Sequence, residues 1–276
     1  MIPMSLRHAV LLVLLFSCPV TAMVTGPDVF LSAFQRADYP AALASLAEVS
    51  DDPLAPVYRA TCLTMMQRSD EAADLFRRAA SDSGAFAQVA LFAQAQALFD
   101  LRCYARAQTV LDRLARRFPH GRFAERGLDL ALRIERRLSD GLTQANVEWY
   151  QDQGLAAYAQ AHSGLAAEYL EEYRLLAERL GSASEPKAML TLTAVALELD
   201  DHALMASSIT LVPPATADWR GALYRGLVHV AAGEVADAKT DLHEARLNST
   251  DATVKKRVDD VLADIDAPEP SKASAP

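Results

Sequence analysis

The chain has 276 residues, an apolar content of 51% and a formal net charge of −9. This length and apolar fraction suffice for one large hydrophobic core or for two domains of ordinary size. The acidic balance argues against nucleic acid as the partner, because proteins that grip the phosphate backbone usually carry a basic surplus. Alanine and leucine recur in nearly every segment and no β-rich stretch is present, which favours an all-helical chain.

The first 22 residues have the features of a secretory signal peptide. An apolar run over residues 9–16 is too short to span a bilayer, and Val20 and Ala22 stand at the small-residue positions of a cleavage site after Ala22. A second interpretation stays open: the Leu-Phe-Ser-Cys stretch resembles a bacterial lipobox, so that the signal covers residues 1–17 and lipidation of Cys18 attaches the chain to a membrane. In a third interpretation, the segment is not cleaved and anchors the chain in the membrane. Each version predicts an exported protein, periplasmic or associated with the outer membrane.

An internal repeat runs from residue 27 to about residue 250. Its marker is an alanine followed four and seven positions later by apolar or small residues, found at Ala42, Ala72, Ala107, Ala166 and Ala238, and more weakly near Ala203. Twelve positions before four of these alanines lies a small residue: Ala60, Ala95, Gly154 or Gly226. These spacings place apolar residues on one stripe of each helix, and the small residues let two helix backbones approach closely. The pattern predicts helix pairs joined by short turns.

This pattern resembles the tetratricopeptide repeat (TPR). The Phe-Pro and Phe-Ala-Glu ends of the segment from Phe118 to Glu125 are similar to a link in exported bacterial TPR proteins, such as the outer-membrane assembly lipoprotein and the Tol-Pal coordinator. The resemblance implies an all-α superhelical array of about fourteen helices in antiparallel pairs. It also implies a non-enzymatic scaffold that binds envelope proteins or peptides.

The repeat divides the mature chain into four parts. We expect TPR-like repeats over 27–119, an Arg-rich extra helix with further repeats over 120–250, a capping helix over 251–266 and a disordered tail over 267–276. The extra helix is expected at about 122–138. The capping helix has one apolar and one charged side, as the water-facing end of a repeat array requires.

Charge is unevenly distributed along the chain. Ten arginines and four acids lie between Arg102 and Arg137, whereas the chain from residue 138 onward has a net charge of −11. Spacings of 4, 7 and 4 place a partial stripe of arginines on the extra helix: Arg122, Arg126, Arg133 and Arg137. Arginine stems commonly cover helix exteriors with their heads in water. The alternative is a docking patch for an acidic partner segment, an anionic lipid or a cell-wall polymer.

The resemblance further implies that the first helix of each pair lines a binding groove. By position, this groove receives Phe92, Gln96, Phe99 and Asp100 in one repeat, Gln151, Leu155 and Tyr158 in another, and Arg220, Leu223 and Leu227 in the last. Such a mixture of aromatic, amide and charged side chains can clamp an extended or helical peptide. Each of these residues taken alone fits a core position equally well.

Motifs for catalysis or cofactor binding are absent from the sequence. It has no Gly-x-Ser-x-Gly, Gly-rich phosphate loop, His-Glu-x-x-His or Cys-x-x-Cys, so we expect no enzyme activity, cofactor or metal site. Cys62 and Cys103 are expected to be small buried hydrophobes, and whether they pair stays open. Glu171 and Glu172 are expected to be solvated, and His229 to be a satisfied core or groove histidine. The alternative function is a periplasmic or transporter-associated repeat protein that holds a small hydrophobic molecule.

Overall fold

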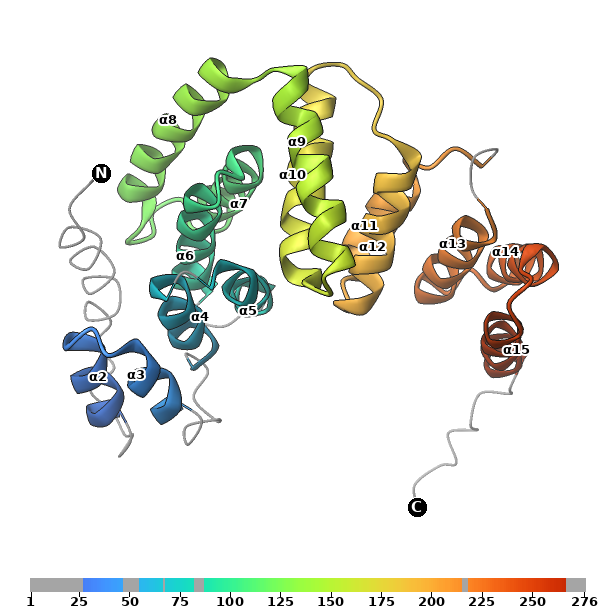
Figure 1. Cartoon of the computed structure of the whole chain (residues 1–276), viewed down its shortest axis with the longest axis horizontal. Helices are drawn as coiled ribbons and strands as arrows, with labels where there is room; N and C mark the ends of the chain where they lie inside the picture. The colour runs from blue at the N-terminus through green and yellow to red at the C-terminus, as the bar shows by residue number, and fades with distance from the viewer. Residues whose placement is uncertain (1–26, 47–54, 67, 82–86, 215–217, 267–276) are drawn as a thin grey trace. The chain divides into compact units, whose positions relative to one another are not determined.

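The computed structural model describes residues 27–46, 55–66, 68–81, 87–214 and 218–266. The expected signal segment, with Cys18 and both processing sites, and the expected tail over 267–276 lie outside these residues. Within the described ranges the regular structure consists of fourteen helices, α2 to α15, and no strand is found there (Figure 1). The predicted fold class, all-α with antiparallel helix pairs, is confirmed. No helix in these ranges combines the length and the apolar character needed to cross a membrane.

The chain divides into two compact units, of which the first ends at Leu142. Its helices are α2 (Pro27–Gln35), α3 (Tyr39–Ser45), α4 (Ala55–Met65), α5 (Ser69–Ser81), α6 (Ala87–Asp100), α7 (Tyr104–Arg117) and α8 (Ala124–Gly141). The second unit contains α9 (Gln144–Ala159), α10 (Ser163–Arg179), α11 (Pro186–Glu198), α12 (His202–Ile209), α13 (Trp219–Ala232), α14 (Val235–Asn248) and α15 (Ala252–Asp266). Consecutive helices pack as pairs within each unit, and α8 packs on α7 without a second helix of its own.

The alanine of each repeat sits at the centre of its helix pair. All five clear examples, Ala42, Ala72, Ala107, Ala166 and Ala238, are fully buried. The small residues opposite them permit close backbone contact, as predicted: a Cβ atom added to Gly154 would lie 2.6 Å from Cγ of Leu170, and one added to Gly226 would lie 2.8 Å from Cγ of Leu242. Each of these leucines follows the repeat alanine by one helical turn. The local sequence period therefore fixes how each pair packs.

The weakest repeat of the sequence is also a helix pair, α11 with α12. Met205 occupies the position of the repeat alanine and is 1% exposed, while Thr193 takes the small-residue position twelve residues earlier. Thr193 Oγ1 lies 2.8 Å from Oγ of Ser208, and both hydroxyls also contact backbone carbonyl groups of their own helices. Polar side chains and a methionine thus replace the alanine pattern without changing the packing.

The turns inside the pairs share one backbone feature. Two residues before the second helix of five pairs, the backbone has a positive φ: Ala37 (59°), Arg102 (67°), Ala161 (59°), Asp200 (55°) and Gly233 (76°). Glycine adopts this left-handed conformation at no steric cost, whereas the other four residues are strained by it. Because the same turn recurs with unrelated residues, the pairing of the helices determines it.

Cys62 and Cys103 are both buried, and they are not joined to each other by a disulfide bond. Burial raises the pKa of the Cys62 thiol to about 12. The thiol is therefore protonated, and unreactive, throughout the physiological pH range. We expect iodoacetamide at pH 8 to leave Cys62 unmodified in the native protein and to alkylate it fully in guanidinium chloride, as peptide mass spectrometry would show. Alkylation of native Cys62 at the rate of the unfolded chain would contradict the buried position.

Candidate functional site

The groove residues predicted on α6 differ in their exposure. Phe92 is 2% exposed, and its ring stacks on that of Phe123 with 5.0 Å between the ring centroids. Phe92 therefore packs inside the first unit and supports the start of α8. Gln96 and Phe99 are half-buried, and Asp100 is exposed at the end of α6.

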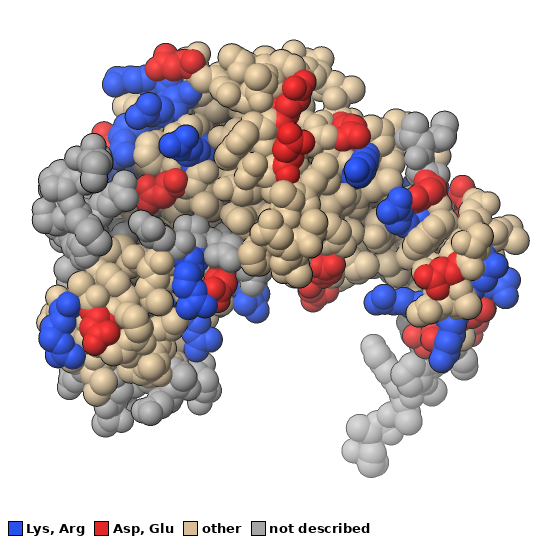
Figure 2. All heavy atoms as spheres, in the orientation of Figure 1, with Lys and Arg blue, Asp and Glu red and all other residues tan. Residues whose placement is uncertain are grey.

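The arginines predicted as a docking patch lie on the exposed surface at α8. Arg122 lies two residues before the helix, and Arg126 and Arg133 lie along it. Figure 2 shows basic side chains gathered over this helix. The buried stripe of α8 consists of Gly127, Leu130, Ile134 and Leu138.

The structure brings two of the predicted residue sets together. The guanidinium carbon of Arg133 lies 4.6 Å from the ring centroid of Phe99, a distance typical of a cation–π contact. Arg122 makes a similar contact with the ring of Phe123, at 5.6 Å. One helical turn before Phe99, the side-chain oxygen of Gln96 is buried and accepts no hydrogen bond from the described residues. We define the α6–α8 face as Gln96, Phe99 and Arg133 with the neighbouring arginines, Arg122 and Arg126; it offers a basic edge and an aromatic ring.

In the second unit, two predicted groove residues on α9 contact the ends of α11. The amide of Gln151 donates to the carboxylate of Glu185, which precedes α11. The hydroxyl of Tyr158 donates to Oε1 of Glu198, the last residue of α11, at 3.2 Å. The hydroxyl of Ser163 donates to the other oxygen of the same carboxylate at 2.5 Å.

The same surface continues onto α13, which is the first helix of the next pair. The neighbours that influence the ionisation of Tyr224 are Tyr158, Arg220, Glu198 and Asp218, which places these five side chains in one group. Burial raises the pKa of Tyr224 and of Tyr158, and the nearby Glu198 carboxylate raises both further. Arg220 donates from Nε to Oδ2 of Asp218 at 2.8 Å, and this pairing lowers the pKa of Asp218. We call this surface, on α9, α11 and α13, the tyrosine–carboxylate face.

Glu185, Glu198 and Tyr224 were not predicted from the sequence. The two glutamates lie at the ends of α11, in the helix pair whose repeat pattern is weakest, so the register that identified Gln151 and Tyr158 could not be extended to them. A signal was nevertheless present: Thr193 stands at the small-residue position of that segment, twelve residues before Met205.

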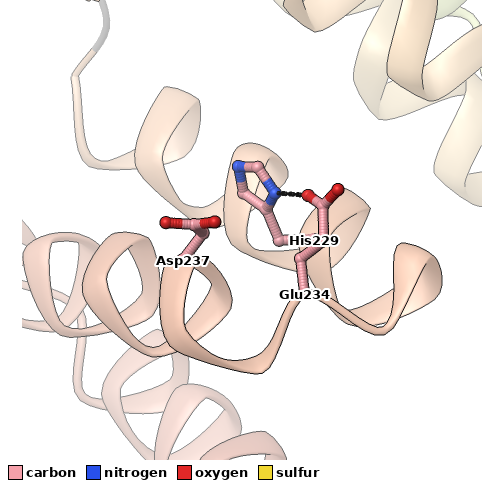
Figure 3. A group of neighbouring side chains, drawn as sticks. All are labelled: His229, Glu234 and Asp237. Atoms are coloured by element: carbon pink, nitrogen blue, oxygen red, sulfur yellow. Dashed lines mark hydrogen bonds and ion pairs between the residues drawn. The ribbon is translucent and has the colours of Figure 1, made fainter.

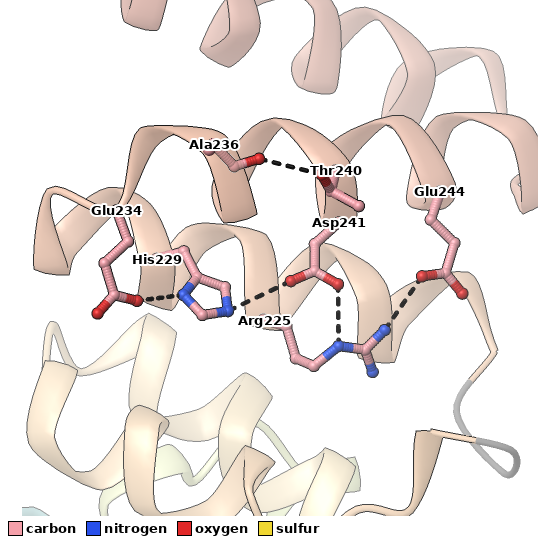
Figure 4. Close-up of polar contacts among 7 residues, drawn as sticks. All are labelled: Arg225, His229, Glu234, Ala236, Thr240, Asp241 and Glu244. Atoms are coloured by element: carbon pink, nitrogen blue, oxygen red, sulfur yellow. Dashed lines mark hydrogen bonds and ion pairs between the residues drawn. The ribbon is translucent and has the colours of Figure 1, made fainter.

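A second polar cluster links α13 to α14 (Figure 4). Arg225 donates from Nε to Oδ1 of Asp241 at 3.0 Å and from Nη2 to Oε2 of Glu244 at 3.3 Å. His229 lies 2.5 Å from Oε2 of Glu234 through Nδ1 and 3.4 Å from Oδ2 of Asp241 through Nε2. Both ring nitrogens face carboxylates, so His229 is a satisfied histidine at the edge of its helix pair.

Beside this cluster, three side chains have the composition of a metal site, which was not predicted from the sequence. The candidate ligand atoms of His229, Glu234 and Asp237 lie within 4.8 Å of one another (Figure 3). An imidazole and two carboxylates are suitable ligands for a divalent transition metal such as zinc. However, Nδ1 of His229 already contacts Glu234, and both acids are exposed. The contacts of His229 with Glu234 and Asp241 account for the position of its imidazole at the junction of the two helices.

The expectation that Glu171 and Glu172 are solvated is wrong. Glu171 is 7% exposed and Glu172 is fully buried, as is Glu168 on the same helix. Nη2 of Arg174 lies 3.7 Å from Oε1 of Glu171. The reason is that α10 packs against both α9 and α11, so more than one of its sides is covered.

Together, these features define a helical-repeat protein: helix pairs with the same turn, the same central alanine and the same small-residue contact. No family model matches the chain, and no curated protein matches it. Among solved structures, the chain is similar to the TPR2AB-domain:pHSP90 complex of yeast Sti1, with 11% identity, a TM-score of 0.37 and coverage of 87% of this chain and 96% of that one. It is also similar to a tetratricopeptide repeat protein from Parabacteroides merdae, with 15% identity, a TM-score of 0.34 and coverage of 85% and 96%.

Proposed function

We propose that the chain is a non-enzymatic interaction scaffold of the bacterial cell envelope that binds a partner protein or peptide. The observation that carries the proposal is the contact of Arg133 with Phe99, because it joins the basic stripe of α8 to the first-helix surface of α6. The envelope assignment is supported by the export features of residues 1–22 and by the lipobox-like stretch that ends at Cys18.

The chemistry of the α6–α8 face indicates an acidic partner segment. Exposed arginines attract carboxylates over about one Debye length and orient them by bidentate hydrogen bonds. The ring of Phe99, which is half-buried and borders the arginines, adds apolar contact with the bound segment. Association through this face should therefore be fast at low ionic strength and weaken as salt is added.

Reversal of two charges tests this face. We expect Arg126→Glu combined with Arg133→Glu to weaken binding of a fluorescein-labelled oligoglutamate peptide to the full chain by at least about tenfold at low salt, measured by fluorescence anisotropy. The matched control is Lys255→Glu with Lys256→Glu on α15, which changes the net charge equally. Equal losses in the two double variants would show that only net charge matters, and the proposal would fail.

Crosslinking in intact cells extends the test to natural partners. The tagged wild-type chain and the Arg126→Glu/Arg133→Glu variant are compared by quantitative mass spectrometry. We expect an envelope protein with an acidic segment to be enriched with the wild-type chain and lost with the variant. Equal recovery with both chains would contradict the use of the α6–α8 face.

A further inference from the structure

The tyrosine–carboxylate face of the second unit holds carboxylates whose charge the protein does not neutralise. The described partners of the Glu185 and Glu198 carboxylates are the amide of Gln151 and the hydroxyls of Tyr158 and Ser163. The backbone N–H of Glu185 donates to the hydroxyl of Tyr173. No Lys or Arg side chain within the described ranges forms an ion pair with either glutamate. Neutral donors of this kind fix the position of a carboxylate and leave its negative charge in place.

Aromatic rings accompany this charge. Tyr158 donates to Glu198, and Tyr224 belongs to the same group. Their raised pKa values keep both phenols neutral at physiological pH, so their hydroxyls remain donors. A carboxylate beside tyrosine rings favours a guanidinium or ammonium group, which gains an ion pair and a cation–π contact together. Arg220 lies near the same two tyrosines, but its guanidinium group pairs with Asp218 and forms no ion pair with Glu198.

The two carboxylates lie at opposite ends of α11, and their separation limits the shape of a ligand. Glu185 precedes the helix, and Glu198 ends it thirteen residues later. At 1.5 Å per helical residue, they are about 20 Å apart along the helix axis. An extended chain covers this distance in about six residues. One continuous segment can therefore reach both carboxylates.

We infer that the tyrosine–carboxylate face binds an extended basic peptide segment with Lys or Arg at two positions about six residues apart. Glu185 and Glu198 each pair with one cation, and Tyr158 and Tyr224 contact the cation at Glu198. The acidic balance of the chain from residue 138 onward, −11, attracts such a segment over a longer range. The inference rests on the proposed scaffold function and adds a second partner, opposite in charge to the one proposed for the α6–α8 face.

The test uses the full chain and two labelled nine-residue peptides, otherwise composed of serine and alanine. One carries arginine at positions 2 and 8, and the other carries its two arginines next to each other. We expect the spaced peptide to bind several-fold more tightly than the other at low salt. Combining Glu185→Gln with Glu198→Gln should weaken binding of the spaced peptide by about tenfold. Glutamine keeps the size of glutamate and can still accept the existing hydrogen bonds, so the fold should be retained, as circular dichroism would show.

The matched control is Asp260→Asn with Asp264→Asn, which removes two exposed charges from α15. We expect this control to change binding of the spaced peptide by less than about twofold. Equal effects of the two double variants, equal binding of the two peptides, or no binding to the wild-type chain would each overturn the inference.

The two proposals fail separately. The Arg126→Glu/Arg133→Glu variant should bind the spaced arginine peptide as the wild-type chain does. If that variant loses oligoglutamate and keeps the arginine peptide, both faces act as described. If the wild-type chain binds oligoglutamate and not the arginine peptide, the inference about the tyrosine–carboxylate face is wrong while the proposed function stands.

Discussion

Replacement of Gly154 by valine is expected to lower the free energy of unfolding of the second unit by about 3 kcal/mol. A Cβ atom at this position would lie 2.6 Å from Cγ and 3.1 Å from the backbone nitrogen of Leu170. Leu170 is fully buried, so neither its side chain nor its helix can move aside without opening the α9–α10 contact. The better helix propensity of valine relative to glycine offsets only a small part of this cost. Urea denaturation followed by far-UV circular dichroism measures the change.

Gly141 provides the control for this experiment. It ends α8, and a Cβ atom added there would meet no atom within 4 Å. Gly141→Val should therefore change the free energy of unfolding by no more than about 0.5 kcal/mol. Gly141 lies in the first unit, so unfolding of the second unit is compared in the two variants. If the second unit unfolds at the same urea concentration in Gly141→Val and Gly154→Val, close backbone approach does not hold α9 and α10 together. Gly154→Ala, with one added methyl group, should fall between the two.

Helix pairs were predictable because the contact that forms them is local and periodic. The repeat alanine and the small residue twelve positions earlier meet across a turn of fixed geometry, so the spacing in the sequence corresponds to a contact in the structure. The expected extra helix at 122–138 is observed as α8 (Ala124–Gly141), and the expected capping helix at 251–266 as α15 (Ala252–Asp266). The boundary between the compact units, after Leu142, depends on which helices pack together and has no counterpart in the sequence pattern.

Other features depend on contacts between pairs and were not predictable. Glu172 looks like a surface residue in sequence, and it is buried because α10 is covered by helices on more than one side. The pattern near Ala203 is weak because Met205 fills the alanine position. For the candidate sites, the sequence indicated which residues lie on first helices, but it did not indicate which side chains they contact. Arg133 on α8 contacts Phe99 on α6, and the whole of α7 lies between these two helices in the sequence.

The second large effect is expected at Phe123, the residue that precedes α8. Its side chain is 1% exposed, and its ring stacks on Phe92 of α6 with an angle of 15° between the ring planes. Phe123→Ala removes this contact and leaves a cavity between the two helices, so we expect a loss of about 4 kcal/mol in the free energy of unfolding of the first unit. Urea denaturation measures this loss, and amide hydrogen exchange should show faster exchange along α8.

The loss should also reach the proposed binding function, because α8 carries Arg133 to the ring of Phe99. Without the Phe123 anchor, the start of α8 is held less firmly on α6, and the arginines no longer have fixed positions relative to the face they border. The Phe123→Ala variant should therefore bind oligoglutamate more weakly than the wild-type chain in buffer without urea, where the variant is still folded. Phe123→Leu, which fills most of the space, should recover most of both losses.

Leu132→Ala on the same helix, at a side chain that is 58% exposed, should alter stability by no more than about 0.5 kcal/mol. If Leu132→Ala and Phe123→Ala were equally destabilised, the stacked pair would not anchor α8, and the orientation of the basic stripe would need another cause.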